Sequence, residues 1–378
     1  MKTKIVHIIT ALSVGGAEQA LYKLLLNTDN SKYTTTVVSL TSVGMKAKKI
    51  KRLGVDVYSC NMNKGIHGVL GLYVLVKVLR KVRPDIVQTW LYHSDLIGGI
   101  IAKTLGIKNI IWGIRTTDIK STSIVTYIVR FICAKLSRSI PEKIIVVAES
   151  SKNKHVELGY YEPKMLVIPN GFEYRNASSK FQDIQLIKSK LHINKKDFVI
   201  GAVGRFSYDK GHDVLIQASK EILKKFPNVK FLLVGPGLEL SNKKVVSIIK
   251  KNSDLSRFLL VGEQSNINSY LQMMNIFCLP SRTEGFPNIL GEAMLLGVPC
   301  VATNVGDVSI LGGNEVLLSK AGSSEDLSRK IVEMMSFAES TRNQIGLILQ
   351  NRIIENYPIS NTVIKHHLLY QELLKEEL

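Results

Sequence analysis

Short apolar runs alternate with amphipathic stretches along the first half of the chain. The runs are bounded by turn-forming residues, and helical patterns separate them. This alternation predicts parallel βαβ units with helices on both faces of a sheet, and ligands bind such sheets outside the carboxyl ends of the strands. The strands expected here are Lys4–Thr10, Thr36–Leu40, Val55–Ser59, Ile86–Thr89, Ile110–Trp112, Lys143–Val147 and Met165–Ile168.

A second series of strands follows a polar segment. Asn170-Gly171 is a turn signal, and linker-like composition continues from Tyr174 to Lys180. The next apolar runs, at residues 198–203, 231–234, 258–261 and 276–279, again end in glycine or proline. A chain of 378 residues is long enough for two domains with substantial cores. The expected parts are an N-terminal domain over 1–175, a second domain over 176–357 and a C-terminal helix over 358–378.

One stretch of the second half combines a strand end, a turn and a helix start. The run Ile276–Leu279 ends at Pro280, and a helix is expected from near Asn288, a residue type that caps helices well. Free backbone N–H groups and the helix dipole predict an anion site there. Glu284 in the turn and Glu292 about one turn inside the helix can face the same ligand. An anion site with two carboxylates predicts a ligand that carries hydroxyl groups as well as phosphate.

The spacing of Glu284 and Glu292 is E-x7-E, within the run E-G-F-P-N-I-L-G-E-A-M. Two solvated acids at a helix start would explain the spacing alone. The surrounding glycines and proline, followed by G-V-P-C-V-A-T-N-V-G, resemble the signature of the retaining family 4 glycosyltransferases. The resemblance implies an α/β GT-B fold, in which two Rossmann-like, doubly wound parallel-sheet domains face a central cleft. It is strongest from Gly201 to Gly306, and the last amphipathic pattern resembles the helix that crosses back to the first domain.

The second domain carries the residues expected to hold a nucleotide-sugar donor. Arg205 and Lys210 bracket a turn after the strand at 198–203, and together they can offset the charge of a diphosphate. The turn lacks the P-loop spacing, but its G-R and K-G pairs resemble the family's phosphate-binding motif. The resemblance implies that Glu292 holds the ribose and Glu284 the donor sugar. It implies further donor contacts at Gly204, Gly235, Gly262, Gly285, Phe286, Pro287, Asn288 and Ile289.

Three residues of the first domain also follow predicted strands. The resemblance implies that Gly16, in the pair Gly15-Gly16, approaches the donor's phosphate or the acceptor through its backbone. His93 lies at a carboxyl edge, where a structural and a functional role are equally compatible with it. Family members commonly have a His that contacts sugar or phosphate where Arg115 stands. The arginine at this position therefore predicts a contact with an anionic group of the donor or acceptor.

The resemblance implies transfer with retention at the anomeric carbon. Arg205 and Lys210 would stabilise the leaving diphosphate, assisted by amides near Asn288 and Ile289. Because no carboxylate nucleophile is evident, we expect a front-side displacement in which the leaving phosphate takes the acceptor's proton. We expect no cofactor and no metal, since no D-x-D-like cluster occurs. The expected donor is a UDP-hexose or UDP-N-acetylhexosamine, and the acceptor a glycan or lipid-linked sugar of bacterial surface-polysaccharide assembly.

Two other functions are compatible with the same fold. A non-catalytic, membrane-associated GT-B scaffold would bind nucleotide without turnover, although it would have no use for Arg205, Lys210, Glu284 and Glu292 together. A GT-B epimerase would act on a UDP-sugar without an acceptor and would release a free epimer from the donor alone. A transferase given only donor should show little beyond slow hydrolysis.

The net charge of +19 is concentrated in the first half. Residues 1–175 contain 26 Lys and Arg against 11 Asp and Glu, whereas residues 176–378 contain 24 against 20. No nucleic-acid-binding motif accompanies the basic residues, so an anionic membrane surface is the expected partner. The basic amphipathic stretch Ile119–Ile140, including Lys120, is typical of interfacial helices and also of ordinary surface helices. A second basic run, Lys46 to Arg52, is interpreted as a solvated helix face.

The N-terminus resembles a secretory signal, but His7 interrupts its apolar run and Gly15-Gly16 leads directly into an amphipathic pattern. We therefore expect a first strand there. No uncharged apolar stretch of transmembrane length occurs. The four cysteines lie in apolar contexts without a C-x-x-C pair, which predicts core thiols in a reducing compartment. The expected location is cytoplasmic and peripheral on the inner face of the cell membrane.

Overall fold

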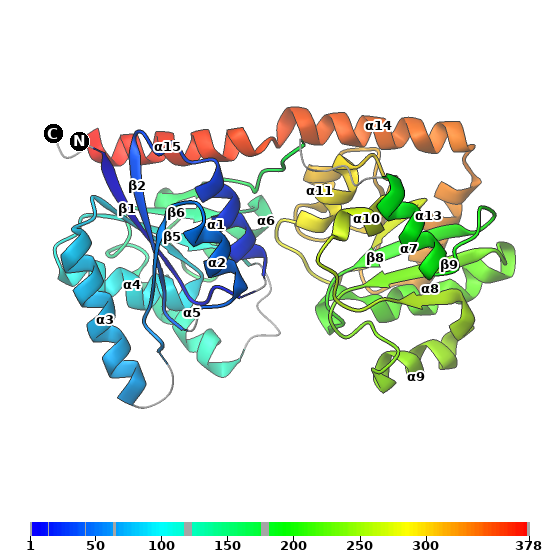
Figure 1. The fold of residues 1–378 in the computed structure, drawn as a ribbon, viewed down its shortest axis with the longest axis horizontal. Helices are drawn as coiled ribbons and strands as arrows, with labels where there is room; N and C mark the ends of the chain where they lie inside the picture. The colour runs from blue at the N-terminus through cyan, green and yellow to red at the C-terminus, as the bar shows by residue number, and fades with distance from the viewer. Residues whose placement is uncertain are drawn as a thin grey trace. The chain divides into compact units, whose positions relative to one another are not determined.

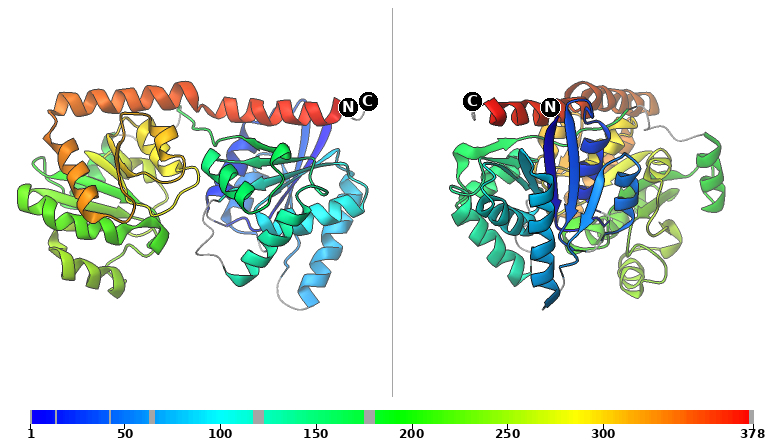
Figure 2. Two further views of the ribbon diagram at one scale, coloured as in Figure 1. Left: turned by 180° about the vertical axis from the view of Figure 1, so that it is seen from behind. Right: turned by 60° about the vertical axis from the view of Figure 1, so that its left-hand side comes forward.

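The computed structural model describes residues 2–13, 15–41, 43–62, 66–116, 123–174 and 181–375. The chain divides into two compact units, one of Met1–Gly171 with Ile359–Leu378 and one of Phe172–Pro358. Each unit contains one parallel sheet with helices on both of its faces (Figures 1 and 2). Most of the linker segment noted in the sequence, and Lys120, lie outside the described residues.

The first unit has a seven-stranded sheet with the strand order β3-β2-β1-β4-β5-β6-β7. Every neighbouring pair is parallel, with Ile5 opposite Ile86 and His7 opposite Gln88 across β1 and β4. From the first strand, the chain adds strands in one direction up to β3 and then in the other from β4. The strands are β1 (Thr3–Ile9), β2 (Tyr33–Ser39), β3 (Asp56–Ser59), β4 (Ile86–Trp90), β5 (Asn109–Ile114), β6 (Lys143–Val146) and β7 (Met165–Val167).

Apolar side chains of this sheet point to both faces, as a buried parallel sheet requires. The helices of the unit are α1 (Gly16–Leu26), α2 (Met45–Lys51), α3 (Ile66–Val82), α4 (Tyr92–Thr104), α5 (Ile124–Leu136), α6 (Glu149–Glu157) and α15 (Ile359–Lys375), with the short 3-10 helix Glu162–Lys164. Val6 and Ile8 pack with residues of α3, α4 and α5. Ile9 packs with α1 and α2 on the other face, where Ile5 meets α15.

The last helix of the chain completes the core of the first unit. Leu369 and Leu373 of α15 are buried against the sheet. The Tyr370 hydroxyl donates to Gln88 Oε1 on β4, and Lys143 Nζ lies 2.7 Å from Glu372 Oε1. The first unit is therefore built from two segments that lie nearly two hundred residues apart in the sequence.

The second unit has a six-stranded parallel sheet with the order β10-β9-β8-β11-β12-β13. Its strands are β8 (Phe198–Val203), β9 (Val229–Val234), β10 (Phe258–Leu260), β11 (Ile276–Leu279), β12 (Cys300–Thr303) and β13 (Leu317–Ser319). Its helices are α7 (Phe181–Lys190), α8 (His212–Lys225), α9 (Lys243–Asn252), α10 (Ile267–Leu271), α11 (Asn288–Leu295), α12 (Val308–Gly312), α13 (Ser324–Ser336) and α14 (Glu339–Asn356), with 3-10 helices Tyr208–Lys210 and Leu255–Arg257. Apolar residues of α8, α9 and α13 form the core on one face of this sheet.

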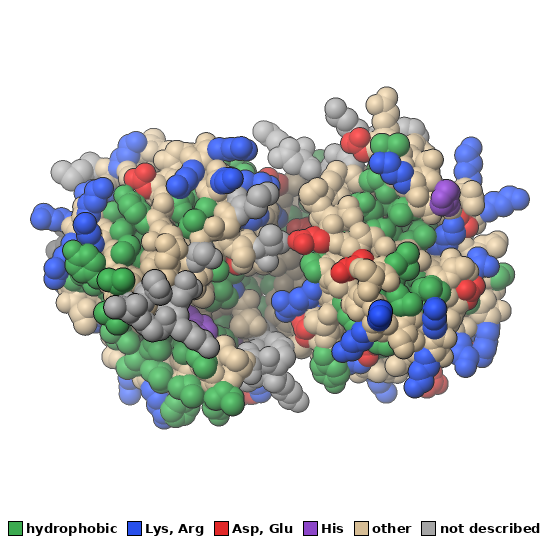
Figure 3. Space-filling view, turned by 60° about the horizontal axis from the view of Figure 1, so that its bottom comes forward, with side chains coloured by type: hydrophobic (Ala, Val, Ile, Leu, Met, Phe, Trp, Pro, Cys, Tyr) green, Lys and Arg blue, Asp and Glu red, His purple; other side chains and the backbone are tan. Residues whose placement is uncertain are grey.

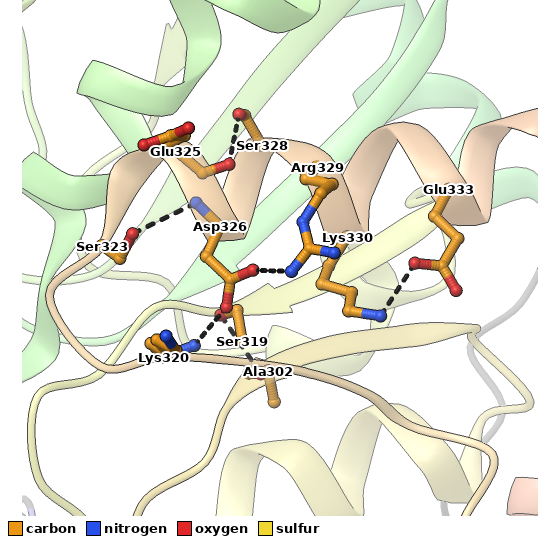
Figure 4. Close-up of polar contacts among 10 residues, drawn as sticks. All are labelled: Ala302, Ser319, Lys320, Ser323, Glu325, Asp326, Ser328, Arg329, Lys330 and Glu333. Atoms are coloured by element: carbon orange, nitrogen blue, oxygen red, sulfur yellow. Dashed lines mark hydrogen bonds and ion pairs between the residues drawn. The ribbon is translucent and has the colours of Figure 1, made fainter.

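Local polar contacts fix the start of α13 (Figure 4). Ser323 is its N-cap, and its hydroxyl oxygen accepts a hydrogen bond from the Asp326 backbone N at 3.1 Å. The Asp326 carboxylate accepts from the Lys320 backbone N at 2.7 Å and pairs with Arg329. Since Lys320 directly follows β13, these bonds hold the turn between strand and helix.

One sequence expectation about a single residue is wrong. Asn288 is the first residue of α11 and not its cap, because the chain already turns at Pro287 and the Asn288 N–H donates to Phe286 O at 2.9 Å. Arg130, one of the cations of the basic stretch that forms α5, does not face solvent. It is buried, with its guanidinium over the Tyr127 ring.

Other expectations are confirmed. All four cysteines are buried and free, and the apolar run at the N-terminus forms β1. Within the described part of the chain, no helix combines the length and apolarity needed to cross a bilayer.

Candidate active site

The sheet of the second unit reverses its direction of growth between β8 and β11. Loops that follow two such strands lie side by side at the carboxyl edge, where parallel α/β sheets bind their ligands. We call residues 204–211 the β8 loop and residues 280–287 the β11 loop. These two loops carry most of the second-domain residues singled out in the sequence.

An ion pair joins the two loops. Lys210 Nζ lies 2.7 Å from Glu284 Oε1, and the Ser281 hydroxyl donates to the same oxygen at 2.7 Å. The Thr303 hydroxyl, at the end of β12, donates to Ser281 O. The Glu284 side chain is only 9% exposed, so these partners take the place of water around its carboxylate. Sequence analysis identified Lys210 and Glu284 but missed Ser281 and Thr303.

A glycine and a second ion pair hold the loops in place. Gly211 has φ +63°, and a Cβ there would lie 2.0 Å from Pro280 O, so the two backbones touch. Arg282 Nη1 and Nη2 donate to the two carboxylate oxygens of Asp213 at 2.8 and 2.7 Å. Burial alone would raise the pKa of Asp213, but the bonds and charge of Arg282 lower it overall. No motif pairs Arg282 with Asp213; the sequence indicates only that Arg282 lies in the β11 loop and that Asp213 follows the β8 loop closely.

Arg205 lies in the same loop as Lys210 but is much more exposed. Its side chain is 69% exposed, and Nη2 lies 3.6 Å from Asp209 Oδ2. Burial alone would raise the pKa of Asp209, but a hydrogen bond from Ser207 and the charges of Arg205 and Lys210 lower it overall. The loop therefore presents two cations, one fixed by Glu284 and one at the surface.

Glycines bring the ends of β8, β9 and β10 together. Gly235, at φ +141°, donates from its N–H to Gly262 O at 2.8 Å, and a Cβ on it would lie 2.2 Å from Gly204 O. The three strand ends therefore meet through backbone groups, without side chains between them. The N–H groups of Gly204, Gly235 and Gly262 already donate to Val234 O, Gly262 O and Leu238 O, so these glycines offer a ligand close approach to the backbone and no free N–H of their own.

His212 is a further residue at this edge that sequence analysis missed. It is the first residue of α8 and is 1% exposed. Burial and the neighbouring charge of Lys210 lower the pKa of His212 to about 4, so the ring is neutral at pH 7. Neither ring nitrogen has a hydrogen-bond partner in the described part of the chain.

The other residues expected around α11 differ in what they offer a ligand. The Phe286 ring packs between Phe172 and Tyr357, with centroids 6.1 and 6.0 Å away, so the ring belongs to the apolar packing of the unit. Gly285 O accepts from the Asp307 N–H at 3.0 Å. Pro287 is buried; Asn288, Ile289 and Glu292 are partly buried in the first turns of the helix. Among the residues described, no three His, Cys, Asp or Glu side chains gather as metal ligands would.

The first unit places Gly16, His93 and Arg115 at the carboxyl edge of its own sheet. Gly16 begins α1 just after β1, and His93 lies in the first turn of α4 after β4. Burial lowers the pKa of His93. Arg115 follows β5 and stacks on Trp90, with Cζ 4.1 Å from the ring centroid. Since β1 and β4 flank the point where this sheet reverses its growth, this edge is a second place suited to a ligand.

Two Rossmann-like parallel-sheet units, each with polar residues at its switch point, define a protein of the GT-B class. The family model described as Glycosyltransferase Family 4 matches residues 14–175, and that described as Glycosyl transferases group 1 matches residues 183–348. The capsular polysaccharide biosynthesis glycosyltransferase CapM of Staphylococcus aureus is 30% identical over 312 residues, 81% of either chain. The chain therefore belongs to the family of glycosyltransferases that these two models describe and that includes CapM.

Two further proteins are similar to this chain. The UDP-Gal:alpha-D-GlcNAc-diphosphoundecaprenol alpha-1,3-galactosyltransferase of Escherichia coli is 25% identical over 319 residues, 82% of this chain and 81% of the relative. The crystal structure of Anabaena HepE in complex with UDP and glucose superposes with a TM-score of 0.85 at 19% identity, covering 98% of this chain and all of that one. The α/β GT-B fold expected from the sequence is confirmed.

Proposed function

We propose that this chain is a retaining glycosyltransferase that moves a sugar from a UDP-sugar to a glycan or lipid-linked acceptor during surface-polysaccharide assembly. The observation that carries the proposal is the contact of Lys210 with Glu284 at the switch point of the second sheet. The relatives support the substrate class, because one acts in capsular polysaccharide biosynthesis and another uses UDP-Gal and a diphosphoundecaprenol-linked sugar. HepE was crystallised with UDP and glucose.

Charge complementarity assigns the donor's parts to the second unit. Arg205 and Lys210 offset the negative charge of the donor's diphosphate, and the main-chain groups around Gly204, Gly235 and Gly262 hold the nucleotide. Glu284 Oε1 already accepts two hydrogen bonds, so Oε2 is the atom that accepts from a hydroxyl of the donor sugar. Glu292 holds the ribose hydroxyls.

The reaction is a front-side displacement. A bond forms between the acceptor oxygen and the anomeric carbon while the bond from that carbon to the β-phosphate oxygen breaks. The departing phosphate takes the acceptor's hydroxyl proton, so no protein base is needed. Arg205 and Lys210 stabilise the diphosphate as its charge grows, and we propose that this makes the transfer of a hexosyl or N-acetylhexosaminyl group independent of metal.

An exposed apolar surface in the first unit supports peripheral binding to an anionic membrane. We call it the α3–α5 surface; its exposed side chains are Val69, Leu70, Leu72, Tyr73, Ile124, Val125, Tyr127, Ile128, Phe131 and Ile132. Figures 1 and 2 show both helices on the same side of this unit, and Figure 3 shows hydrophobic side chains gathered on it beside Lys and Arg. Apolar residues bordered by cations are the composition that inserts into a lipid interface.

Replacing Lys210 tests the donor site. Lys210→Ala should lower turnover at least about tenfold, because the leaving diphosphate loses one of its cations. Lys224→Ala is the matched control, since Lys224 pairs with Glu221 at 2.7 Å on the surface of the same unit. Transfer from a panel of UDP-sugars is measured by chromatography, and the anomeric configuration of the product by NMR. An inverted product would contradict the mechanism.

Replacing Glu284 separates the sugar from the nucleotide. Glu284→Gln keeps the size of the side chain but removes its charge, and it should lower turnover while UDP still binds in calorimetry. Loss of UDP binding at intact fold would contradict the assignment of Glu284 to the sugar. UDP binding by the wild-type chain without turnover of any UDP-sugar in the presence of acceptors would contradict the transferase function itself.

A further inference from the structure

One nitrogen of the Arg115 guanidinium group makes a hydrogen bond, and the edge formed by its other two nitrogens makes none among the described residues. Nη1 donates to Asn170 Oδ1 at 3.1 Å, and the planar group stacks on Trp90. Nε and Nη2 are shielded from solvent and have no hydrogen-bond partner among the residues that the structure describes. These two nitrogens form the side of a guanidinium that donates two parallel hydrogen bonds to one carboxylate or phosphate.

The surroundings of Arg115 do not neutralise its charge. Burial lowers the pKa of Arg115 to about 10, so the group stays charged at neutral pH. Burial, together with the charge of Arg115, lowers the pKa values of His7 and His366 to about 3, so neither ring is charged. The acidic groups whose charge would act on Arg115 are Tyr370 and Asp95, but burial raises the pKa of Tyr370 far above neutrality and that of Asp95 to about 7. Asp95 Oδ1 accepts from Thr89 and Gly113, and Oδ2 has no described partner, so Asp95 and Arg115 are not in contact.

A buried arginine with a purely structural role is normally paired with a carboxylate. The contacts of Arg115 with Trp90 and Asn170 need only the ring-facing plane and one nitrogen. They account for the position of the side chain but leave its two-nitrogen edge and its charge unexplained. An oxyanion ligand held by that edge would account for both.

We propose that Arg115 binds a carboxylate or phosphate group of the substrate through Nε and Nη2. The proposal rests on the proposed function and narrows its substrate class to molecules with an oxyanion within reach of the first unit. The oxyanion belongs either to the transferred sugar, as in a uronic acid, or to the acceptor, as in a sugar phosphate.

Whether the donor carries the oxyanion is tested by comparing UDP-glucuronate with UDP-glucose. The two differ by a carboxylate in place of a hydroxymethyl group. Binding to the full chain is measured by calorimetry and thermal shift, which need no turnover. If the donor carries the group, the wild-type chain should bind UDP-glucuronate about tenfold or more tightly relative to UDP-glucose. Arg115→Lys should lose that preference, since an ammonium cannot form the two parallel bonds.

Whether the acceptor carries the oxyanion is tested by comparing the binding of methyl glucoside 6-phosphate with that of methyl glucoside, both in the presence of UDP. The same preference and the same loss in Arg115→Lys are expected if the acceptor carries the group. Arg138→Lys is the matched control, because Arg138 also stacks on an aromatic ring, 4.9 Å from Tyr161, but lies at the surface. Arg115→Gln repeats both arms without a charge, so that a folding defect in one variant does not decide the result.

A preference for the anionic ligand in either arm that disappears at Arg115 and survives in the Arg138 control supports the proposal. No preference in either arm, or a preference that both Arg115 variants retain, overturns it. Failure of the proposed function is seen separately, as absence of transfer from every UDP-sugar. The binding comparison remains valid in that case, because it does not depend on transfer.

Discussion

Gly211 shows how one residue can hold two loops together. It lies in the left-handed region at φ +63°, and its α-carbon is so close to the β11 loop that a Cβ would lie 2.0 Å from Pro280 O. Gly322, also in the second unit, has a similar φ of +77° but nothing within 4 Å of its Cβ position. The two glycines therefore share backbone strain on substitution, and only Gly211 adds a collision.

Gly211→Ala should lower the free energy of unfolding by about 1–3 kcal/mol more than Gly322→Ala does. It should also weaken donor turnover, because the collision separates Lys210 from Glu284. Urea unfolding followed by far-UV circular dichroism measures the first effect, and the transfer assay the second. Equal losses of stability in the two variants would show that contact between the loops contributes nothing.

The helix α5 shows how an element can be apolar on two faces. Cys133 and Ala134 are buried in the core of the first unit, whereas Ile124, Ile128 and Phe131 are 79, 50 and 53% exposed. The exposed residues recur at helical spacing, so they form one continuous stripe. A surface helix with an uncovered apolar stripe indicates an interface, and the surplus of cations in this half of the sequence favours a lipid surface.

Ile128→Gln with Phe131→Gln should reduce binding to vesicles containing phosphatidylglycerol about fivefold or more, because two inserting side chains are lost. Leu347→Gln with Ile348→Gln on α14 is the matched control, since these residues are also exposed and apolar. Cosedimentation measures binding. Binding should weaken with salt and on neutral vesicles; equal binding of both double variants would argue against the α3–α5 surface as the membrane contact.

At the scale of the whole molecule, buried histidines make acid destabilise the first unit more than the second. Burial lowers the pKa of His7 and His366 to about 3 and of His155 to about 4, and all three lie in the first unit. Each binds its proton near pH 6.5 when unfolded, so acidification below about pH 6.5 favours the unfolded state. Burial raises the pKa of Asp95 to about 7, which acts in the opposite direction and offsets one histidine. In the second unit, burial and the charge of Lys210 lower the pKa of His212 to about 4.

The first unit should therefore lose more stability than the second between about pH 6.5 and pH 5. Both tryptophans of the chain, Trp90 and Trp112, lie in the first unit, so their fluorescence reports its unfolding in urea. Hydrogen exchange of peptides from the second unit, corrected for the intrinsic pH dependence, provides the comparison. Equal losses in the two units would contradict the assignment of neutral histidines to the first core.

The local pattern of the sequence predicted the strands well, because a buried parallel strand is a short apolar run wherever it lies in the fold. β11 lies where the run Ile276–Leu279 placed it, and β8 coincides with Phe198–Val203. β13 (Leu317–Ser319) was missed. α11 begins at Asn288, where a helix was expected, but Pro287 and not Asn288 is the cap residue.

The sequence by itself determined the α/β class, the residues that follow each strand and the resemblance to a glycosyltransferase, because these depend on periodicity and motifs within a few residues. Only the tertiary structure decided that Arg282 pairs with Asp213, that Arg130 turns inward while Phe131 stays outside, and that Arg115 stacks on Trp90 with one edge unused. Each of these facts depends on which strands become neighbours in a sheet and which helix faces the sheet covers. Residue spacing along the chain does not contain that information.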